Sequence, residues 1–233
     1  MNIKSKILII AGSDSSGGAG IQADIKTVSA LGSYAMTAVT AVTAQNTRGV
    51  KKITPIPTKN VQKQIVLILD DIGAHATKIG MLHNMHIIKC VYKIIKKYKL
   101  KNVVLDPVMV AKGGAKLIDS NSINYLKKLL FPLCTLVTPN IPEAELLTGC
   151  SILNKEDMLK AAKKILNMGS KNVLLKGGHL KNKMIYDILV TPKKIEIFKK
   201  RRIKTKNTHG TGCTLSSALA TCLSQGKNIS RSC

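Results

Sequence analysis

Short, wholly apolar runs alternate with amphipathic segments along this chain, and this alternation restricts the possible fold more than any other feature. Buried strands of a parallel sheet read as continuous apolar runs because helices cover both faces of the sheet. Strands are predicted at 7–10, 36–44, 77–80, 102–106, 135–138 and 173–175, with a hairpin over 185–190 and 195–198. The pattern predicts an α/β fold with a mainly parallel central sheet covered by helices on both faces.

The segments between these strands carry apolar residues at helical spacing. Ile21, Ile25, Val28 and Leu31 form one stripe of a helix that stops at Gly32. Further helices are predicted after Asn84, Ser120 and Asn154, between Pro142 and Gly149, and from Gly210 onward.

Length and composition limit the class of protein. The 233 residues suit one compact domain spanning 1–233, and 45% of them are hydrophobic. No run approaches the ~18 apolar residues that a membrane-spanning helix needs, and the apolar run that begins at Ile7 is too short for a signal peptide. The six cysteines show no CxxC spacing, so neither a disulfide framework nor a zinc site is predicted. We expect a cytoplasmic protein with no membrane partner.

The formal charge of +25 suggests a nucleic-acid partner, but the kinds of residue present argue against a specific one. Only four of the 37 basic residues are arginine, and aromatic residues make up 3% of the chain. Arginine forks and aromatic stacking platforms carry most specific recognition of nucleic acids. We therefore expect no specific nucleic-acid partner. The densest basic patch, 199–206, would serve a phosphorylated small ligand equally well.

Ligands of parallel α/β sheets bind beyond the carboxyl ends of the strands. In this chain, polar and glycine-rich sequence gathers at the positions that follow predicted strands. The segments are 12–20, 45–46, 80–81, 106–108, 140–143, 176–178 and 208–213. This clustering predicts a small-molecule site at one edge of the sheet.

The glycine-rich segment 12–20 follows a strand and opens a helix. It is not a Walker P-loop, because Gly18 and Ala19 stand where Lys and Ser or Thr are required. A dinucleotide fingerprint is also incomplete, since 36–44 lacks the acidic residue that would hold a ribose. Two interpretations remain: a glycine-rich surface for a small ligand, with Asp24 one turn into the helix, or a tight turn that binds nothing.

The segment 207–215 is more specific. Gly210 and Gly212, separated by Thr211, let consecutive backbone N–H groups converge, and the next helix directs its positive end at the same point. Such a turn, ending in Cys213, is an anion hole that suits the charge on a transferring phosphoryl group. The alternative is a plain helix start, which has little need for two glycines. The segment predicts the phosphoryl-transfer centre of an ATP-dependent small-molecule kinase.

Asn140 and Glu143 place an amide and a carboxylate at a helix start that follows a strand. Glu143 could simply satisfy the helix dipole, or it could hold a magnesium ion through water. Asp106 ends the preceding buried strand and supplies a second acid near the same edge, which favours the metal interpretation.

Together these segments resemble the ribokinase-like vitamin kinases, and most closely the hydroxymethylpyrimidine/phosphomethylpyrimidine kinases of thiamine biosynthesis. The resemblance rests on AGSDSSGGAGIQAD at 11–24, AQNTRGV at 44–50, KIGML at 78–82, VLDPVM at 104–109, TPNIPEA at 138–144, KGGH at 176–179 and KNTHGTGCT at 206–214. It implies a ribokinase-like three-layer sandwich that forms a homodimer. It also implies that ATP and Mg²⁺ serve to phosphorylate 4-amino-5-hydroxymethyl-2-methylpyrimidine and then its monophosphate.

The resemblance also implies roles for individual residues. The aminopyrimidine would be surrounded by Gly12, Asp24, Gln45, Met81 and Val108. The magnesium ion would be held by Asp106 and Glu143, and the nucleotide would face Asn140, Lys176, Thr208 and Thr211. The catalytic turn would consist of Gly210, Gly212 and Cys213.

Cys213 occupies the place where sugar kinases of this superfamily carry a catalytic aspartate. Because a helix N-terminus lowers the pKa of a thiol, we expect Cys213 to accept the proton of the alcohol in the first phosphorylation. The second step hardly needs a base, since a phosphate monoester is largely dianionic at neutral pH. Positioning and charge neutralisation are expected to dominate, with Cys213 as a modest contributor.

Members of this family usually continue beyond the helix that follows the anion hole, whereas this chain ends at Cys233. We therefore expect a single kinase domain that lacks the usual C-terminal end. Two alternatives stay open: a pyridoxine/pyridoxal kinase of the same fold, and a truncated, inactive remnant.

Overall fold

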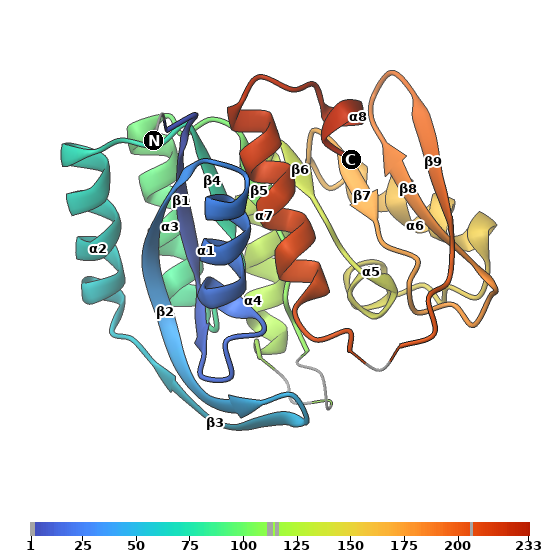
Figure 1. The fold of residues 1–233 in the computed structure, drawn as a ribbon, viewed down its shortest axis with the longest axis horizontal. Helices are drawn as coiled ribbons and strands as arrows, with labels where there is room; N and C mark the ends of the chain where they lie inside the picture. The colour runs from blue at the N-terminus through green and yellow to red at the C-terminus, as the bar shows by residue number, and fades with distance from the viewer. Residues whose placement is uncertain (1–2, 111–113, 115–116, 206) are drawn as a thin grey trace.

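One sheet runs through the molecule in the computed structural model, which describes residues 3–110, 114, 117–205 and 207–233. Within these residues the sheet has nine strands in the order β3-β2-β1-β4-β5-β6-β7-β8-β9 (Figure 1). The strands are β1 Lys6–Asp14, β2 Tyr34–Asn46, β3 Gly49–Pro55, β4 Ala76–Ile79, β5 Val103–Leu105, β6 Leu136–Val137, β7 Val173–Leu175, β8 Met184–Val190 and β9 Ile195–Arg201.

The strands from β2 to β7 in this order run parallel to their neighbours. At the two edges, β3 pairs antiparallel with β2, and β8 and β9 form an antiparallel hairpin beside β7. The predicted mainly parallel sheet and the predicted hairpin are both confirmed. The carboxyl ends of the parallel strands consequently lie along one edge, where the sequence predicts the site.

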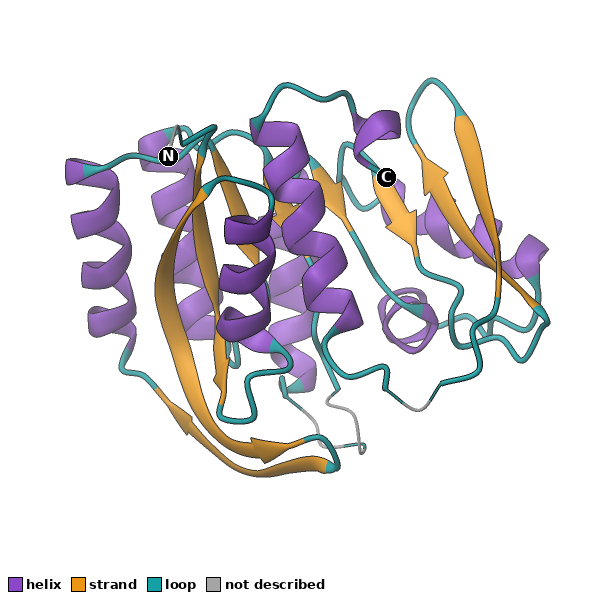
Figure 2. Ribbon diagram, in the orientation of Figure 1, coloured by secondary structure: helices purple, strands orange, loops and turns teal. Residues whose placement is uncertain are grey.

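Helices cover both faces of the sheet, so the fold has three layers (Figure 2). The helices are α1 Gly20–Ala30, α2 Thr58–Asp71, α3 Met85–Tyr98, α4 Ser120–Tyr125, α5 Ile141–Thr148, α6 Lys155–Leu166, α7 Thr211–Ser224 and α8 Ile229–Ser232. Successive side chains of a strand point to opposite faces. Leu8 and Ile10 of β1 accordingly join the larger core beneath α2, α3, α5 and α6, whereas Ile7 and Ile9 join the core beneath α1 and α7.

Several element boundaries differ from the sequence prediction. The N-cap of α4 is Asp119, whose side chain accepts the Ser122 N–H, so the prediction of Ser120 as the cap is wrong. The edge strand β3 was not predicted, because its residues Lys51 and Lys52 are exposed and break any apolar pattern. Asn84 and Asn154 do cap α3 and α6. Among the described helices, none has the length and apolar character needed to cross a bilayer.

Candidate active site

The two glycine-rich segments lie against each other in the structure. A Cβ atom added to Gly210 would come within 1.7 Å of the carbonyl oxygen of Gly18, and one added to Gly18 would come within 2.4 Å of the His209 ring. Gly210 is also the N-cap residue of α7 and has a left-handed φ of 78°, a conformation that favours glycine. Glycine is therefore needed for a backbone approach that a side chain would prevent, and both segments belong to one site.

A largely buried ion pair faces this turn from the carboxyl ends of the central strands. Lys176 Nζ donates to Asp106 Oδ1 at 2.8 Å, and the Thr138 hydroxyl donates to the same oxygen at 3.1 Å. A Cβ atom on Gly212 would lie 3.2 Å from Lys176 Nζ and 3.6 Å from Asp106 Oδ2. The first turn of α7 and the ion pair therefore form one continuous polar surface, with Asp106 Oδ2 directed at the turn.

The two charges of this pair stabilise each other. Burial alone would raise the pKa of Asp106, but Lys176 and Lys78 outweigh it and lower the pKa below its usual value. Burial also opposes the charge on Lys176, but Asp106 and Glu143 raise the pKa of this lysine. Lys176 is therefore cationic at neutral pH, and it lies where it can neutralise an anionic phosphate beside the glycine turn.

Asn140 and Glu143 form a capping box at the start of α5. Asn140 Oδ1 accepts the Glu143 N–H at 3.0 Å, and Glu143 Oε2 accepts the Asn140 N–H at 2.8 Å. Burial raises the pKa of Glu143 to about 8; Lys176 opposes this shift, and Asp106 adds to it. Both interpretations of Glu143 thus remain compatible with the structure, since the residue caps the helix and also lies beside Asp106.

The donor set can be compared with what magnesium requires. No group of three or more His, Cys, Asp or Glu side chains in the described part of the chain could enclose a metal ion. Mg²⁺ usually keeps several waters and is bound by one or two carboxylates together with substrate phosphates. Asp106 and Glu143 therefore fit a magnesium ion that is shared with a bound nucleotide.

Asp24 lies beneath the site. Its side chain has no exposed surface and pairs with the equally buried Lys78 at 2.7 Å. Its other oxygen accepts the Ser217 hydroxyl at 2.7 Å. With both carboxylate oxygens occupied and no exposed surface, Asp24 does not touch the site in this structure, so the geometry does not support the predicted direct contact with the substrate. The Asp24–Lys78–Ser217 contact instead joins α1, β4 and α7 under the glycine turn.

Cys213 is half-buried in the first turn of α7. Burial raises the pKa of this thiol to about 11; Lys78 opposes the shift, whereas Asp24 and Asp106 add to it. The expectation of a lowered thiol pKa is therefore wrong, because desolvation and two carboxylates outweigh the helix N-terminus. Cys213 carries its proton at neutral pH, which makes it a weak hydrogen-bond donor and not a ready base.

Three of the predicted substrate residues lie together in a small, mostly buried apolar cluster beside the glycine-rich loop. Met81 packs with Ala41 and Leu117, and Val108 packs against this small cluster. A Cβ atom on Gly12 would lie 3.2 Å from Met81 Sδ. The structure therefore brings Gly12, Met81 and Val108 together, in a setting that suits one face of a flat, partly apolar ring.

Gln45 lies at a β-bulge, since the pairing of β2 with β3 shifts between Ala44 and Gln45. A bulge re-aims the side chain it carries. The Thr43 hydroxyl donates to the Ser13 carbonyl at 2.8 Å and lies 3.0 Å from the end of the Gln45 side-chain amide, and the Ser15 hydroxyl donates to the Gln45 carbonyl at 2.7 Å. Thr43 thereby holds one end of the Gln45 side-chain amide, and the other end is the group that could bond a ligand.

The predicted nucleotide residues lie on both sides of the glycine turn. Asn140 and Lys176 are joined by a parallel β-bridge between the segments that follow β6 and β7. Thr208 and Thr211 are exposed at the start of α7, where the Thr211 hydroxyl donates to the Thr208 carbonyl at 3.1 Å. All four residues belong to the same edge of the sheet.

Sequence reasoning assigned no role to Lys78 or to the pair formed by Asp14 and His209. Lys78 resembles the many surface lysines of the chain, although its position between Thr77 and Ile79 in a short apolar strand indicates burial. His209 Nε2 lies 2.8 Å from Asp14 Oδ2. Both partners of that pair adjoin glycine segments singled out in the sequence, but they are 195 positions apart.

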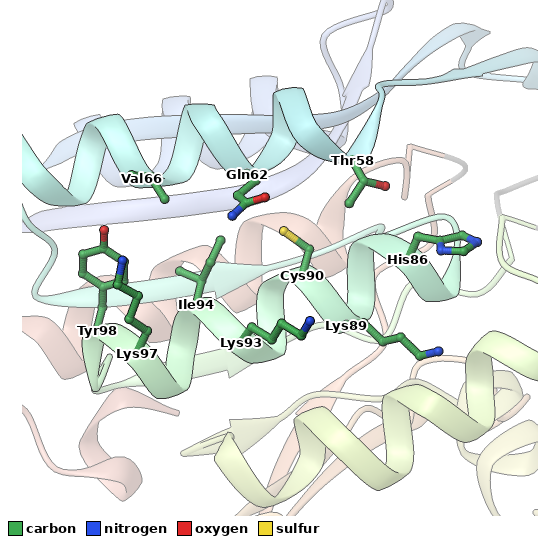
Figure 3. Close-up of a pocket in the computed structure, with 10 residues that line it drawn as sticks. All are labelled: Thr58, Gln62, Val66, His86, Lys89, Cys90, Lys93, Ile94, Lys97 and Tyr98. Carbon is green, nitrogen blue, oxygen red and sulfur yellow. The ribbon is translucent and has the colours of Figure 1, made fainter.

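A separate groove lies between α2 and α3, with a volume of about 430 Å³ (Figure 3). Cys90 and Ile94 of α3 face Gln62 and Val66 of α2 across it. None of the residues predicted for substrate, nucleotide or metal lines this groove. The groove therefore plays no part in the site described above.

The mainly parallel sheet, its three layers and a glycine turn beside a Lys–Asp pair define a small-molecule kinase of the ribokinase-like fold.

Comparison with known proteins agrees with this class. The family model described as phosphomethylpyrimidine kinase matches residues 14–233. The thiamine biosynthesis bifunctional protein ThiED of Geobacter sulfurreducens is 51% identical over 223 residues, which cover 96% of this chain and 46% of that protein. The hydroxymethylpyrimidine/phosphomethylpyrimidine kinase of Bacillus subtilis is 45% identical over 225 residues, covering 96% of this chain and 83% of the relative. The chain thus spans less than half of the bifunctional relative and most of the single-function one.

Solved structures give the same result. The phosphomethylpyrimidine kinase of Clostridium difficile superposes with a TM-score of 0.86 at 44% identity, covering 99% of this chain and 94% of the other. The ADP complex of Bacillus subtilis pyridoxal kinase superposes with a TM-score of 0.90 at 39% identity, covering 99% of this chain and 87% of the other. The Staphylococcus aureus pyridoxal kinase in complex with AMP-PCP and pyridoxal superposes with a TM-score of 0.91 at 34% identity, covering 100% of this chain and 84% of the other. The chain belongs to the phosphomethylpyrimidine kinase family.

Proposed function

We propose that this kinase transfers the γ-phosphoryl group of ATP to 4-amino-5-hydroxymethyl-2-methylpyrimidine and then to the resulting monophosphate, as a step in thiamine diphosphate biosynthesis. The observation that carries this proposal is the meeting of the two glycine segments beside Lys176 and Asp106. Family membership supports the substrate class, since the family model and relatives that are 45–46% identical are named for this pyrimidine.

The residues divide the work as follows. Gly12, Met81 and Val108 belong to the apolar cluster that contacts the pyrimidine ring, and the Gln45 side-chain amide hydrogen-bonds to the edge of the ring. Lys176 and the backbone N–H groups of the glycine turn neutralise the charge that develops on the transferred phosphoryl group.

A magnesium ion, when bound, would offset the negative charge of the phosphate groups. Asp106 and Glu143 are the residues we propose to hold it. Because Asp106 Oδ1 is occupied by Lys176 and Thr138, Asp106 Oδ2 is the oxygen available to the ion or to one of its waters.

Cys213 in its protonated form donates a hydrogen bond towards the reacting oxygen and does not accept its proton. The proton of the alcohol then passes, late in the transfer, to an oxygen of the incoming phosphoryl group. This assignment is consistent with a loose transition state, in which positioning and electrostatic stabilisation supply most of the rate.

A product assay tests this proposal. The protein is incubated with ATP, Mg²⁺ and the aminopyrimidine alcohol, and monophosphate and diphosphate are separated by chromatography. We expect the monophosphate to appear first and the diphosphate to follow. Pyridoxal is run in parallel, because the pyridoxal kinases of Bacillus subtilis and Staphylococcus aureus share the fold. A higher kcat/KM for pyridoxal than for the pyrimidine would mean that pyridoxal is the substrate. No product from either compound would favour an inactive protein.

Other parts of the proposal concern assembly and location. We propose that residues 1–233 act as one kinase domain, that this domain forms a homodimer, and that it works in the cytoplasm without nucleic-acid or membrane partners. Light scattering on the purified protein checks the homodimer, with twice the 25.2 kDa chain mass as the expected result.

A further inference from the structure

Asp14 organises the glycine-rich loop at the end of β1. Its carboxylate accepts the backbone N–H of Ser16 at 2.9 Å and that of Ala19 at 2.8 Å, and its carbonyl accepts the Gly17 N–H at 2.9 Å. Burial alone would raise the pKa of Asp14, but hydrogen bonds from His209, Ser16 and Ala19 outweigh it and lower the pKa. Asp14 is therefore a fixed anion around which the loop is folded.

His209 reaches this same carboxylate from the other end of the chain. Its Nε2 lies 2.8 Å from Asp14 Oδ2, and the two side chains are only 10% and 2% exposed. The ring lies so close over Gly18 that a Cβ atom there would meet Cδ2 at 2.4 Å. Lys26 is the other charged group that bonds this loop, and its Nζ donates to the Gly17 carbonyl at 2.9 Å. The imidazole is therefore held both by a hydrogen bond and by packing.

The segment that leads into the anion-binding turn has few other attachments. Between the end of β9 at Arg201 and the start of α7 at Thr211, the described residues form no regular secondary structure. Within 203–205 and 207–209, the hydrogen bonds of His209 are the ones that reach a distant segment. Because His209 directly precedes Gly210, which has a left-handed φ of 78°, this contact fixes the direction in which the turn begins.

We propose that His209 is a positioning residue that, by donating to Asp14, aligns the Gly210–Cys213 turn with the glycine-rich loop for phosphoryl transfer. This inference rests on the proposed function in one respect: the turn that His209 aligns is the one proposed to receive the transferred phosphoryl group. Misplacing catalytic groups by about 1 Å costs on the order of 10²-fold in rate. The Asp14–His209 contact therefore affects kcat, whereas the apolar cluster around Met81 affects binding of the pyrimidine.

Two substitutions separate positioning from bulk stability. His209→Ala removes the donor, whereas His209→Gln keeps an N–H donor at a reach similar to that of Nε2. We expect His209→Ala to lower kcat about 10²-fold while the KM for the aminopyrimidine changes less than threefold. His209→Gln should recover at least tenfold of the loss. His86→Ala, an exposed histidine on α3, is the matched control and should stay within twofold of the unmodified protein.

Hydrogen–deuterium exchange tests the contact without relying on turnover. In His209→Ala, backbone exchange should accelerate both in 12–22 and in 208–215, and in His209→Gln it should stay close to that of the unmodified protein. Unchanged exchange in 12–22 would overturn the proposal, as would a kcat for His209→Ala within threefold of the original. If the protein phosphorylates no pyrimidine, the proposed function fails, yet exchange in the two segments still decides whether His209 couples them.

Discussion

Breaking the buried Asp24–Lys78 pair is the perturbation with the largest predicted effect on stability. Both side chains are fully buried, their charged atoms lie 2.7 Å apart, and Ser217 supplies a further hydrogen bond to Asp24. Burial opposes the charge on Lys78, but Asp24, Cys213 and Asp106 together outweigh it, and the pKa of Lys78 is raised. Lys78→Met leaves Asp24 buried without a counter-charge, which costs ~3–5 kcal/mol of unfolding free energy.

Urea denaturation followed by circular dichroism measures this loss. With an m-value of about 2–3 kcal/mol per molar, the midpoint should fall by about 1–2 M. The double variant Asp24→Asn/Lys78→Met removes both charges and should recover at least half of the loss, because most of the cost comes from the unpaired carboxylate. Lys63→Met on the exposed side of α2 is the control, with an expected change within ~0.5 kcal/mol. A loss below ~1 kcal/mol for Lys78→Met would refute the reasoning.

Three further predictions follow from the site. Alkylation of Cys213, read by mass spectrometry of its peptide, should be slow at pH 7 and accelerate towards pH 11, because burial raises the pKa of the thiol to about 11; fast alkylation at pH 7 would contradict this. Asp14→Asn should lower the urea midpoint of the protein at pH 7, and the difference from the unmodified protein should shrink as the pH falls below the ordinary pKa of aspartate. The sign follows because a carboxyl group whose pKa is lowered by folding stabilises the protein above its unfolded-state pKa, and this stability is lost as the pH falls. An equal loss of urea midpoint at pH 7 and at the acidic pH would contradict it. Gly210→Ala should cost at least ~2 kcal/mol, because the residue has positive φ and its Cβ would strike Gly18; an unchanged melting temperature would contradict the close approach.

The sequence was informative where local pattern decides structure. Apolar runs located the central strands, and Asn84 and Asn154 marked helix starts because capping is a local interaction. The strand-end segments also met at one edge, because parallel topology leaves them no other place. The edge strand β3 was not predicted, because pairing with β2, and not burial, holds Lys51 and Lys52 in an extended conformation.

The site was harder to predict wherever two distant segments determine a property together. Asp24 was expected at the ligand, but its environment is set by Lys78 of β4 and Ser217 of α7, which no sequence spacing links to it. Cys213 begins a helix, which by itself lowers a thiol pKa; burial beside Asp24 and Asp106 reverses the sign. The Asp14–His209 contact likewise exists only once the chain has folded.

Gly212→Ala tests the central claim, that the turn at the start of α7 receives the transferred phosphoryl group. The added methyl would lie 3.2 Å from Lys176 Nζ and 3.6 Å from Asp106 Oδ2, so it enters the polar surface without striking backbone. Phosphate transfer from ATP to the aminopyrimidine alcohol is measured for both proteins, with melting temperatures as the check on folding. We predict a loss of kcat of about 10²–10³-fold with a nearly unchanged melting temperature. A folded Gly212→Ala protein with kcat within tenfold of the original would contradict the account.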